Sequence, residues 1–338
     1  MTRIPDTNRQ VVLVARPDGI PGPEHFEVRE GPVPEPGAGE MLVRNLFLSV
    51  DPAQRGYASA VANYADPVPL GGVMRGFALG EVAQSRHPDF PVGARVVGMF
   101  GWQDVAVSDG SQVLFTVPAD STAPAGAFMG ILGLSGITAY FGLLEVGQPK
   151  AGETVVVSTA AGSVGSAVGQ IARIRGCRAV GITGGPDKVA LCTGVFGYDA
   201  AVDYKAGGLD AALAAACPDG IDVYFDNTGG AISDTVMGRM NQGGRIVVCG
   251  TAATASWDPP PQGPRVERAV LVKRLRMQGL IIFDYRDRYG EAQAQLGQWL
   301  AAGDLAYREE VLDGIAQAPG AILRLYQGRN MGKLMIRL

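Results

Sequence analysis

A glycine turn between a strand-like run and a helix-like run is the feature of this sequence with the clearest chemical meaning. The apolar residues 154–158 lead into Ala-Ala-Gly-Ser-Val-Gly at residues 160–165, and a small-residue helix follows. Gly162 would let the backbone approach a pyrophosphate, Gly165 would permit close packing of helix on strand, and the first N–H groups of the helix would bind phosphate oxygens. Ala160 replaces the first glycine of the Gly-x-Gly-x-x-Gly pattern. Because strand and helix stand where that pattern requires them, we predict a dinucleotide site here rather than a purely structural turn.

The end of the next expected strand, residues 177–183, indicates which dinucleotide is bound. An NAD enzyme usually carries Asp or Glu at this position, about 20 residues after the turn, for the ribose 2′-hydroxyl. This chain has Thr183 there and Lys188 just beyond it. A 2′-phosphate is tolerated where no acid stands, and Lys188 can pair with it, although a single lysine is usually a solvated surface residue. The sequence therefore favours NADP over NAD.

The residues that could hold a metal ion are few and scattered. The histidines are His25 and His87, and the cysteines stand singly at positions 177, 192, 217 and 249. This spacing fits neither a structural nor a catalytic zinc site, so we expect no metal. Unpatterned cysteines and a polar beginning without an apolar signal region also predict a cytoplasmic protein.

Composition bounds the class of protein and its partners. Of 338 residues, 47% are hydrophobic and 18% charged, as in a packed globular chain of about two domains. The balance of 29 basic and 33 acidic residues, without a basic run, predicts no nucleic-acid partner. Residues 121–144 are uncharged and long enough to span a bilayer, but Pro124 and five glycines interrupt them. We expect a buried helix there and no membrane contact.

Two patterns of elements divide the chain. From residue 10 to about 120, short apolar runs lie between Pro/Gly-rich turns, which is typical of an antiparallel, barrel-like domain. From residue 153, strands alternate with helices, which predicts a parallel, doubly wound sheet. The expected strands of this second part are residues 154–158, 177–183, 201–203, 221–227, 245–250 and 275–283. The tail is expected to form helices over 291–302 and 314–327 and a strand over 332–338.

The chain resembles the zinc-independent medium-chain dehydrogenase/reductase family, specifically its alkenal double-bond reductases, prostaglandin reductases and bacterial curcumin reductases. The matching segments, in the family's order, are Leu48-Ser-Val-Asp-Pro52 with Arg55-Gly56, Gly71-Gly-Val-Met74, Gly101-Trp102, Gly136-Ile-Thr-Ala-Tyr-Phe-Gly-Leu-Leu144, Ala160-Ala-Gly-Ser-Val-Gly165, Phe225-Asp-Asn-Thr-Gly-Gly230, Cys249-Gly250 and Asn330-Met-Gly-Lys333. The resemblance implies an α/β protein with a GroES-like antiparallel β-barrel domain, residues 1–125 and 304–338, and a Rossmann domain with a doubly wound parallel sheet, residues 126–303. It also implies a homodimer.

The same resemblance implies which residues bind NADP. They are Gly162, Ser163, Val164 and Gly165 at the pyrophosphate, Lys188 and Tyr204 at the 2′-phosphate, and, on later loops, Asn227, Cys249, Gly250, Thr251, Ala255, Ile281, Ile282, Phe283 and Asn330. Taken alone, Asn227 could make an Asx turn, and Asn330 could lie in an ordinary exposed turn.

The sequence departs from the family where the substrate is bound. The family tyrosine after Cys-Gly is Ala255 here, with Trp257 two residues on, and the tyrosine expected after Asp51-Pro52 is Ala53, with Tyr57 four residues later. We take Tyr57 as the candidate catalytic residue, with the alternative that it only lines the pocket. The candidate pocket residues are Tyr57, Tyr64, Trp257 and Tyr285.

The reaction that follows is NADPH-dependent reduction of the carbon–carbon double bond of an α,β-unsaturated ketone or aldehyde. Hydride goes to the β-carbon, and without zinc the donor to the carbonyl oxygen must be a hydroxyl, a backbone N–H or the cofactor ribose. Two alternatives remain open. One is an NADPH quinone oxidoreductase of the same fold, and the other is a non-enzymatic NADPH-binding protein, which the missing tyrosines motivate.

Overall fold

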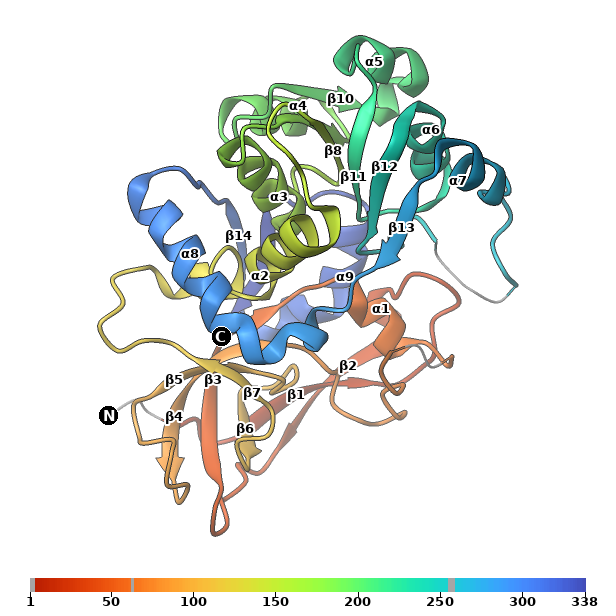
Figure 1. Cartoon of the computed structure of the whole chain (residues 1–338). Coiled ribbons are helices and arrows are strands. Elements are labelled where there is room, and N and C mark those ends of the chain that lie inside the picture. The colour runs from red at the N-terminus through yellow and green to blue at the C-terminus, as the bar shows by residue number, and fades with distance from the viewer. Residues whose placement is uncertain (1–3, 62–63, 255–258) are drawn as a thin grey trace. The chain divides into compact units, whose positions relative to one another are not determined.

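The chain folds into two compact units (Figure 1). One comprises Met1–Met129 and Glu309–Leu338, and the other comprises Gly130–Arg308. The computed structural model describes residues 4–61, 64–254 and 259–338.

The first unit is built on a sheet in which most neighbours are antiparallel. Its strands lie in the order β14-β15-β3-β4-β5-β7, and β6 also pairs with β3. The bounds are β3 (Met41–Ser49), β4 (Ala78–Ser85), β5 (Arg95–Gly98), β6 (Val105–Ser108), β7 (Val113–Thr116), β14 (Glu309–Asp313) and β15 (Lys333–Arg337). β14 and β15 are parallel to each other. A separate antiparallel pair consists of β1 (Asn8–Leu13) and β2 (Phe26–Gly31). The expected antiparallel domain is confirmed.

The C-terminal tail belongs to this first unit because β15 pairs with β3, with Met335 opposite Ser49. The core between them is apolar and includes Leu48, Trp102 and Ile336, all buried. The Trp102 indole N–H donates to the carbonyl of Ser49 at 3.1 Å, so its polar atom is satisfied. Two short helices complete the unit, α1 (Ala53–Ala58) and α9 (Ala318–Tyr326).

The second unit is a six-stranded parallel sheet in the order β10-β9-β8-β11-β12-β13. The strands are β8 (Thr154–Ser158), β9 (Arg178–Thr183), β10 (Ala200–Asp203), β11 (Ile221–Asp226), β12 (Met240–Val248) and β13 (Arg276–Gly279). All five residues of β8 are buried, as a central strand covered on both faces requires. This strand order is that of a doubly wound Rossmann sheet, so the expected fold is confirmed.

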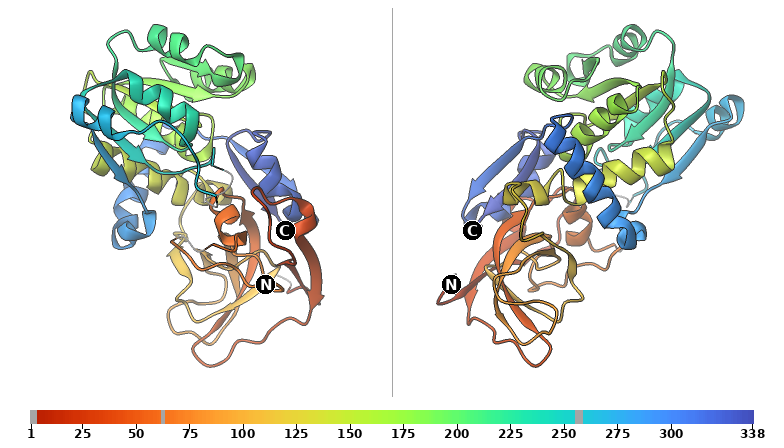
Figure 2. Two further views of the ribbon diagram at one scale, coloured as in Figure 1. Left: turned by 90° about the vertical axis from the view of Figure 1, so that its right-hand side faces the viewer. Right: turned by 60° about the vertical axis from the view of Figure 1, so that its left-hand side comes forward.

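Helices lie on both faces of this parallel sheet (Figure 2). They are α2 (Leu134–Phe141), α3 (Ser163–Ile174), α4 (Pro186–Gly194), α5 (Leu209–Ala216), α6 (Gly230–Arg239), α7 (Glu267–Lys273) and α8 (Tyr289–Ala302). On one face, Val156 and Ile246 of the sheet pack with Leu213 of α5, Val236 of α6 and Val270 of α7. The alternation of strand and helix thus buries both faces of the sheet.

Three expected elements differ from the structure. The strand expected over residues 275–283 ends at Gly279, and a 3₁₀ helix, Ile282–Arg288, follows. The helix expected over 314–327 begins only at Ala318, because Gly314 has a positive φ of 86° and proline is accommodated in the first turn. Residues 121–144 do not form one helix but a short 3₁₀ helix, Ala125–Met129, followed by α2. No helix in the described ranges is long and apolar enough to cross a membrane.

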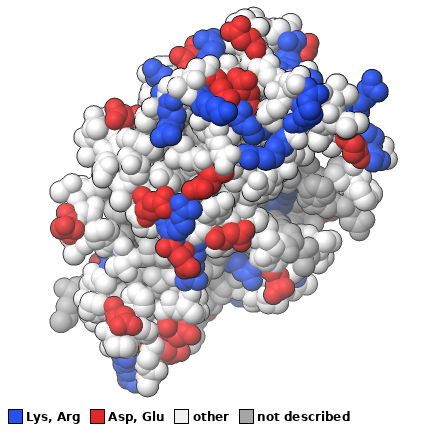
Figure 3. Space-filling model, in the orientation of Figure 1, with Lys and Arg blue, Asp and Glu red and all other residues white. Residues whose placement is uncertain are grey.

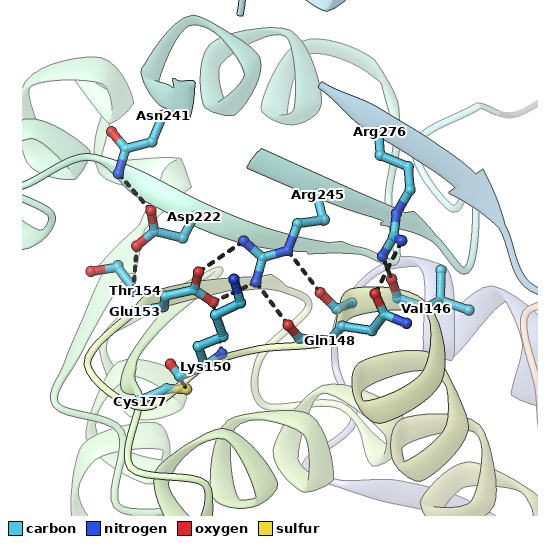
Figure 4. A network of polar contacts seen from close by, with 11 residues as sticks. Val146, Gln148, Lys150, Glu153, Thr154, Cys177, Asp222, Asn241, Arg245 and Arg276 are labelled. Carbon is cyan, nitrogen blue, oxygen red and sulfur yellow. Dashed lines mark hydrogen bonds and ion pairs between the residues drawn. The ribbon is translucent and has the colours of Figure 1, made fainter. Parts of the chain in front are cut away.

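A polar network closes the amino edge of the parallel sheet (Figure 4). Arg245 of β12 forms a two-point ion pair with Glu153, with Nη1 3.0 Å from Oε1, and also donates to the carbonyls of residues 147 and 148. Asp222 accepts the N–H of Thr154 at 2.8 Å. These bonds fix the beginnings of β8 and β11 and leave the carboxyl edge for ligands.

Charged side chains of both signs are interspersed on the surface that Figure 3 shows. In the second unit, for example, Arg288 forms ion pairs with Glu145 and Glu291 at 2.8 and 2.9 Å.

Candidate functional site

The glycine turn after β8 has the geometry of an anion site. Thr159 has a positive φ of 55°, and its carbonyl accepts the N–H of Gly162 at 2.8 Å. A Cβ at Gly165 would lie 2.3 Å from the Thr159 oxygen, so this position requires glycine. The first intrahelical bond of α3 runs from Ser166 to Gly162, which leaves the preceding N–H groups of the helix for a phosphate.

A tyrosine that the sequence did not single out holds this helix on the sheet. The buried hydroxyl of Tyr198 donates to the carbonyl of Gly165 at 2.6 Å. A Cβ at Gly169 would lie 2.1 Å from the Tyr198 ring, so this glycine makes room for it. Burial raises the pKa of Tyr198 well above its usual value, and the residue acts as a neutral anchor.

The ends of β9 and β10 lie together, with Thr183 in register with Asp203. Asp203 Oδ1 accepts the N–H groups of Gly185 and Lys205, both at 2.9 Å, and these bonds hold the pKa of Asp203 below its usual value. Tyr204 follows directly and is exposed, while Lys188 is half-buried in the first turns of α4. The end of β9 has no acidic residue in its own sequence, but Asp203 of β10 places a carboxylate beside it. Only the pairing of β9 with β10 reveals this neighbour.

Asn227 bridges the ends of β8 and β11. Its Nδ2 donates to the Ser158 carbonyl at 2.7 Å, and its N–H donates to Ser158 Oγ at 2.8 Å. The Asx turn at this loop is made by Asp226, which accepts from Thr228 N at 2.9 Å and Gly229 N at 2.8 Å. The alternative that Asn227 makes that turn is therefore wrong.

The loop after β12 packs on this same turn. The N–H groups of Cys249 and Gly250 donate to the Asp226 carbonyl, at 2.8 and 3.1 Å. A Cβ at Gly250 would lie 2.9 Å from the Asn227 carbonyl oxygen, so the close approach needs glycine. Thr251 follows, with its Cα 3.8 Å from the Cβ position of Gly229. Ala255 and Trp257 lie outside the described residues.

The segment after β13 completes the carboxyl edge of the sheet. Leu280 N donates to the Val248 carbonyl at 3.0 Å, which places the following Ile281, Ile282 and Phe283 beyond the ends of β12 and β13. Tyr285, in the 3₁₀ helix that follows, stacks on Phe141 with ring centroids 4.7 Å apart. In an open α/β sheet, ligands bind outside the carboxyl ends of the strands, and the described cofactor candidates of this unit follow those ends.

The other candidates belong to the first unit. Tyr57 is 2% exposed, its ring meets that of Tyr64 edge to face with centroids 6.3 Å apart, and the Arg75 guanidinium lies 5.2 Å from its ring centroid. Burial, reinforced by Tyr64, raises the pKa of Tyr57 well above its usual value. Asn330 is buried, and its Nδ2 donates to the Gly332 carbonyl at 2.9 Å, so it does not lie in an exposed turn.

Lys333 is a buried cation whose role no local pattern indicated. Its Nζ donates to Asp51 Oδ1 at 2.6 Å, to Ser49 Oγ at 2.5 Å and to the Val50 carbonyl at 3.3 Å. The pair joins β15 to the turn that begins α1, on which Tyr57 lies.

The cysteines are free thiols at four separate positions. Burial raises the pKa of Cys177 and Cys217 to about 11 and of Cys192 and Cys249 to about 12. Across the described ranges, no group of three or more His, Cys, Asp or Glu side chains could hold a metal ion.

Two family models match the chain. Residues 9–116 match the N-terminal domain of oxidoreductase, and residues 163–298 match a model described as zinc-binding dehydrogenase. The side chains of the described residues do not fit the metal of that second description.

The chain is 43% identical to the NADPH-dependent curcumin reductase of Escherichia coli (strain K12), over 98% of this chain and 97% of that protein. It is 38% identical to the NADP(+)-dependent 2-alkenal reductase of Nicotiana tabacum, over 98% and 97% of the two chains. The crystal structure of CurA in complex with NADPH from Vibrio vulnificus is 42% identical, with a TM-score of 0.92 over 97% and 98% of the two chains. This chain therefore belongs to the medium-chain dehydrogenase/reductase family, together with the NADPH-dependent curcumin reductases and the 2-alkenal reductases.

Proposed function

We propose that this protein uses NADPH to reduce the carbon–carbon double bond of α,β-unsaturated ketones or aldehydes, without a metal. The observation that carries the proposal is the glycine turn after β8, in a chain 43% identical over 98% of its length to an NADPH-dependent curcumin reductase. NADPH, when bound, supplies the hydride that adds to the β-carbon.

The chain's own residues hold the cofactor. Ser163, Val164 and Gly165 present backbone N–H groups to the pyrophosphate, Gly162 lets the backbone approach it, and Lys188 and Tyr204 bind the 2′-phosphate. Asn227, fixed by two bonds to Ser158, and the loop that begins at Cys249 form the walls nearer the nicotinamide. Ile281, Ile282, Phe283 and Asn330 make the remaining cofactor contacts.

Negative charge develops on the carbonyl oxygen of the substrate, and a donor there lowers the barrier. Tyr57 is a poor donor because its hydroxyl is buried and burial raises its pKa well above the usual value. We therefore assign Tyr57 and its neighbour Tyr64 to the wall of the substrate pocket. The cofactor ribose and solvent then supply the hydroxyl and the proton.

The test is NADPH oxidation against a panel of short alkenals, aryl enones and quinones, with product analysis. We expect saturated carbonyl products that carry deuterium at the β-carbon when the C4-deuterated cofactor is used. Trp257 is two residues after Ala255, the position at which the family has a tyrosine. We therefore expect aryl enones to react faster than short aliphatic alkenals. Reduction of quinones alone would establish the quinone oxidoreductase, and NADPH binding without any turnover would establish a non-enzymatic binding protein.

We also propose a homodimer. β13 is an edge strand of the parallel sheet and all four of its residues are exposed. Leu271 and Val272, which precede it, are 76% and 58% exposed, and Met277 lies on it. An apolar edge of this kind pairs readily with a second chain.

Light scattering should give a dimer mass for the wild type and a monomer mass for the double variant Leu271→Asp/Met277→Asp. Val195→Asp, at an exposed position on the segment after α4, should stay dimeric; a monomeric wild type contradicts the proposal.

A reducing compartment such as the cytoplasm agrees with the cysteines, all of which lie in the described ranges and are free. Cell fractionation tests this part of the proposal, and recovery of the protein with secreted material would contradict it.

A further inference from the structure

We propose that Lys205 is a second cation for the 2′-phosphate of NADPH, beside Lys188, and that it offsets the charge of Asp203. This inference rests on the proposed function, because it presupposes NADPH at the carboxyl edge of the parallel sheet. It concerns a residue that neither the glycine motif nor the family pattern indicated.

Asp203 creates the need for such a cation. It is in register with Thr183, at the end of the strand where an NAD enzyme places the acid for the ribose 2′-hydroxyl. The N–H groups of Gly185 and Lys205, each 2.9 Å from Oδ1, keep the carboxylate ionised. A fixed negative charge beside the adenosine ribose would repel a 2′-phosphate unless a positive charge balanced it.

The position of Lys205 meets this need. A Cβ at Gly184 would lie 2.9 Å from Lys205 Cε and 3.0 Å from Tyr204 Cε1, so the lysine stem lies against the backbone just after β9. Its Nζ is 6.0 Å from the centroid of the Tyr204 ring, which places the cation beside the other residue assigned to the 2′-phosphate.

The ammonium group of Lys205 can also donate hydrogen bonds to a phosphate. Its Nζ lies over the Tyr204 ring, and its charge helps to lower the pKa of Asp203. An ammonium group has three donors, and the side chain is exposed. The glycine at 184 leaves room for the stem, since a Cβ there would make close contacts with both Lys205 and Tyr204.

The experiment measures the binding of 2′,5′-ADP and 5′-AMP by calorimetry, so that the readout is the phosphate itself and not turnover. Lys205→Met keeps the stem and removes the charge. It should weaken 2′,5′-ADP binding about 10-fold and change 5′-AMP binding less than about 2-fold. Lys205→Arg should restore most of the loss. The matched control is Lys150→Met, at the opposite edge of the same sheet, and it should change neither ligand.

A second comparison tests the role of Asp203. In the Asp203→Asn background, Lys205→Met should cost less than in the wild type, because the repulsion that the lysine offsets is gone. An equal loss in both backgrounds would overturn the assignment of Lys205 as the counter-charge of Asp203. Thermal unfolding of each variant checks that it is folded.

The outcomes separate this inference from the proposed function. A wild type that binds 2′,5′-ADP more tightly than 5′-AMP, together with a Lys205→Met variant that keeps this preference, overturns the inference alone. A wild type that binds neither NADPH nor 2′,5′-ADP overturns both.

Discussion

The methyl group of Ala160 occupies the space that a side chain at Gly181 would need. A Cβ at position 181 would lie 2.7 Å from Ala160 Cβ, and Ala160 is fully buried. Its N–H donates to the Ile182 carbonyl at 3.1 Å, so the turn is bonded to β9 at this point. The first glycine of the dinucleotide motif can therefore be alanine in this chain because the neighbouring strand supplies a glycine opposite it.

This relationship predicts that Gly181→Ala is destabilising and that Ala160→Gly repairs it. Two methyl groups cannot share the space, and overpacking of this kind costs about 1–3 kcal/mol of unfolding free energy. Urea unfolding of the two single variants and the double variant measures the coupling. The double variant should regain most of the loss; if it is no more stable than Gly181→Ala, the two positions do not compensate each other.

Lys188→Ala should reduce the preference for NADPH over NADH. Loss of one charged contact to the 2′-phosphate costs about 1.5–3 kcal/mol, or about 10- to 100-fold in the ratio of dissociation constants. Fluorescence titration with both cofactors measures that ratio, and Lys150→Ala is the control. A wild type with equal affinity for NADPH and NADH would refute the assignment.

The layout of the fold was predictable from local patterns, whereas the pairs that shape the site were not. The buried run of β8 and the glycines at 162 and 165 are local signals, and the structure has them in the expected strand and turn. β2 escaped prediction because four of its six residues are exposed and its sequence lacks an apolar face. Asp203 is paired in register with Thr183, and Lys333 forms an ion pair with Asp51. These residues are distant in the sequence, and the hydrophobic periodicity of the sequence does not indicate such contacts.

Tyr57→Phe should change kcat by less than about 3-fold and should act mainly on KM. Burial raises the pKa of this hydroxyl well above its usual value, so it contributes little to charge developing in the transition state. Tyr326→Phe, which removes a half-buried tyrosine hydroxyl of the same unit, is the control. A fall of about 100-fold or more in both kcat and kcat/KM would instead identify Tyr57 as the donor to the oxyanion.

The ion pair of Glu153 with Arg245 predicts a loss of stability in acid. Partial burial raises the pKa of Glu153, but the hydrogen bonds from Arg245 and from the N–H of Lys150 outweigh this and hold it below the usual 4.5. The folded state therefore binds the proton less readily than the unfolded chain. The stabilisation is complete above about pH 4.5 and is lost as the pH falls through the lower, folded-state pKa.

Glu153→Gln should remove this acid-dependent part of the stability. The difference in unfolding free energy between wild type and variant should be largest near neutral pH and should shrink below about pH 4.5. Denaturant titrations at a series of pH values measure it. The exposed Glu30→Gln serves as the control, and a difference that is constant with pH would contradict the assignment.

Lys333→Met should be among the more destabilising single changes in the first unit. Lys333 is 4% exposed and its three bonds satisfy every donor of its ammonium, while the Asp51 carboxylate is also bonded to Ser49. Removing one partner of a buried pair leaves an uncompensated charge, which costs about 3 kcal/mol; because Asp51 retains some solvent contact, we expect a loss somewhat below that figure.

The double variant Asp51→Asn/Lys333→Met separates the charge from the packing at this pair. It should recover part of the stability lost in Lys333→Met, because no ion is then left unpaired. Gln54 also holds the turn that begins α1, because its Oε1 accepts the Asp51 N–H at 2.9 Å, so Tyr57 should keep its place in the double variant. Unfolding free energies of all three variants test this, and a double variant that is less stable than Lys333→Met would show that the pair stabilises the first unit through its shape rather than its charge.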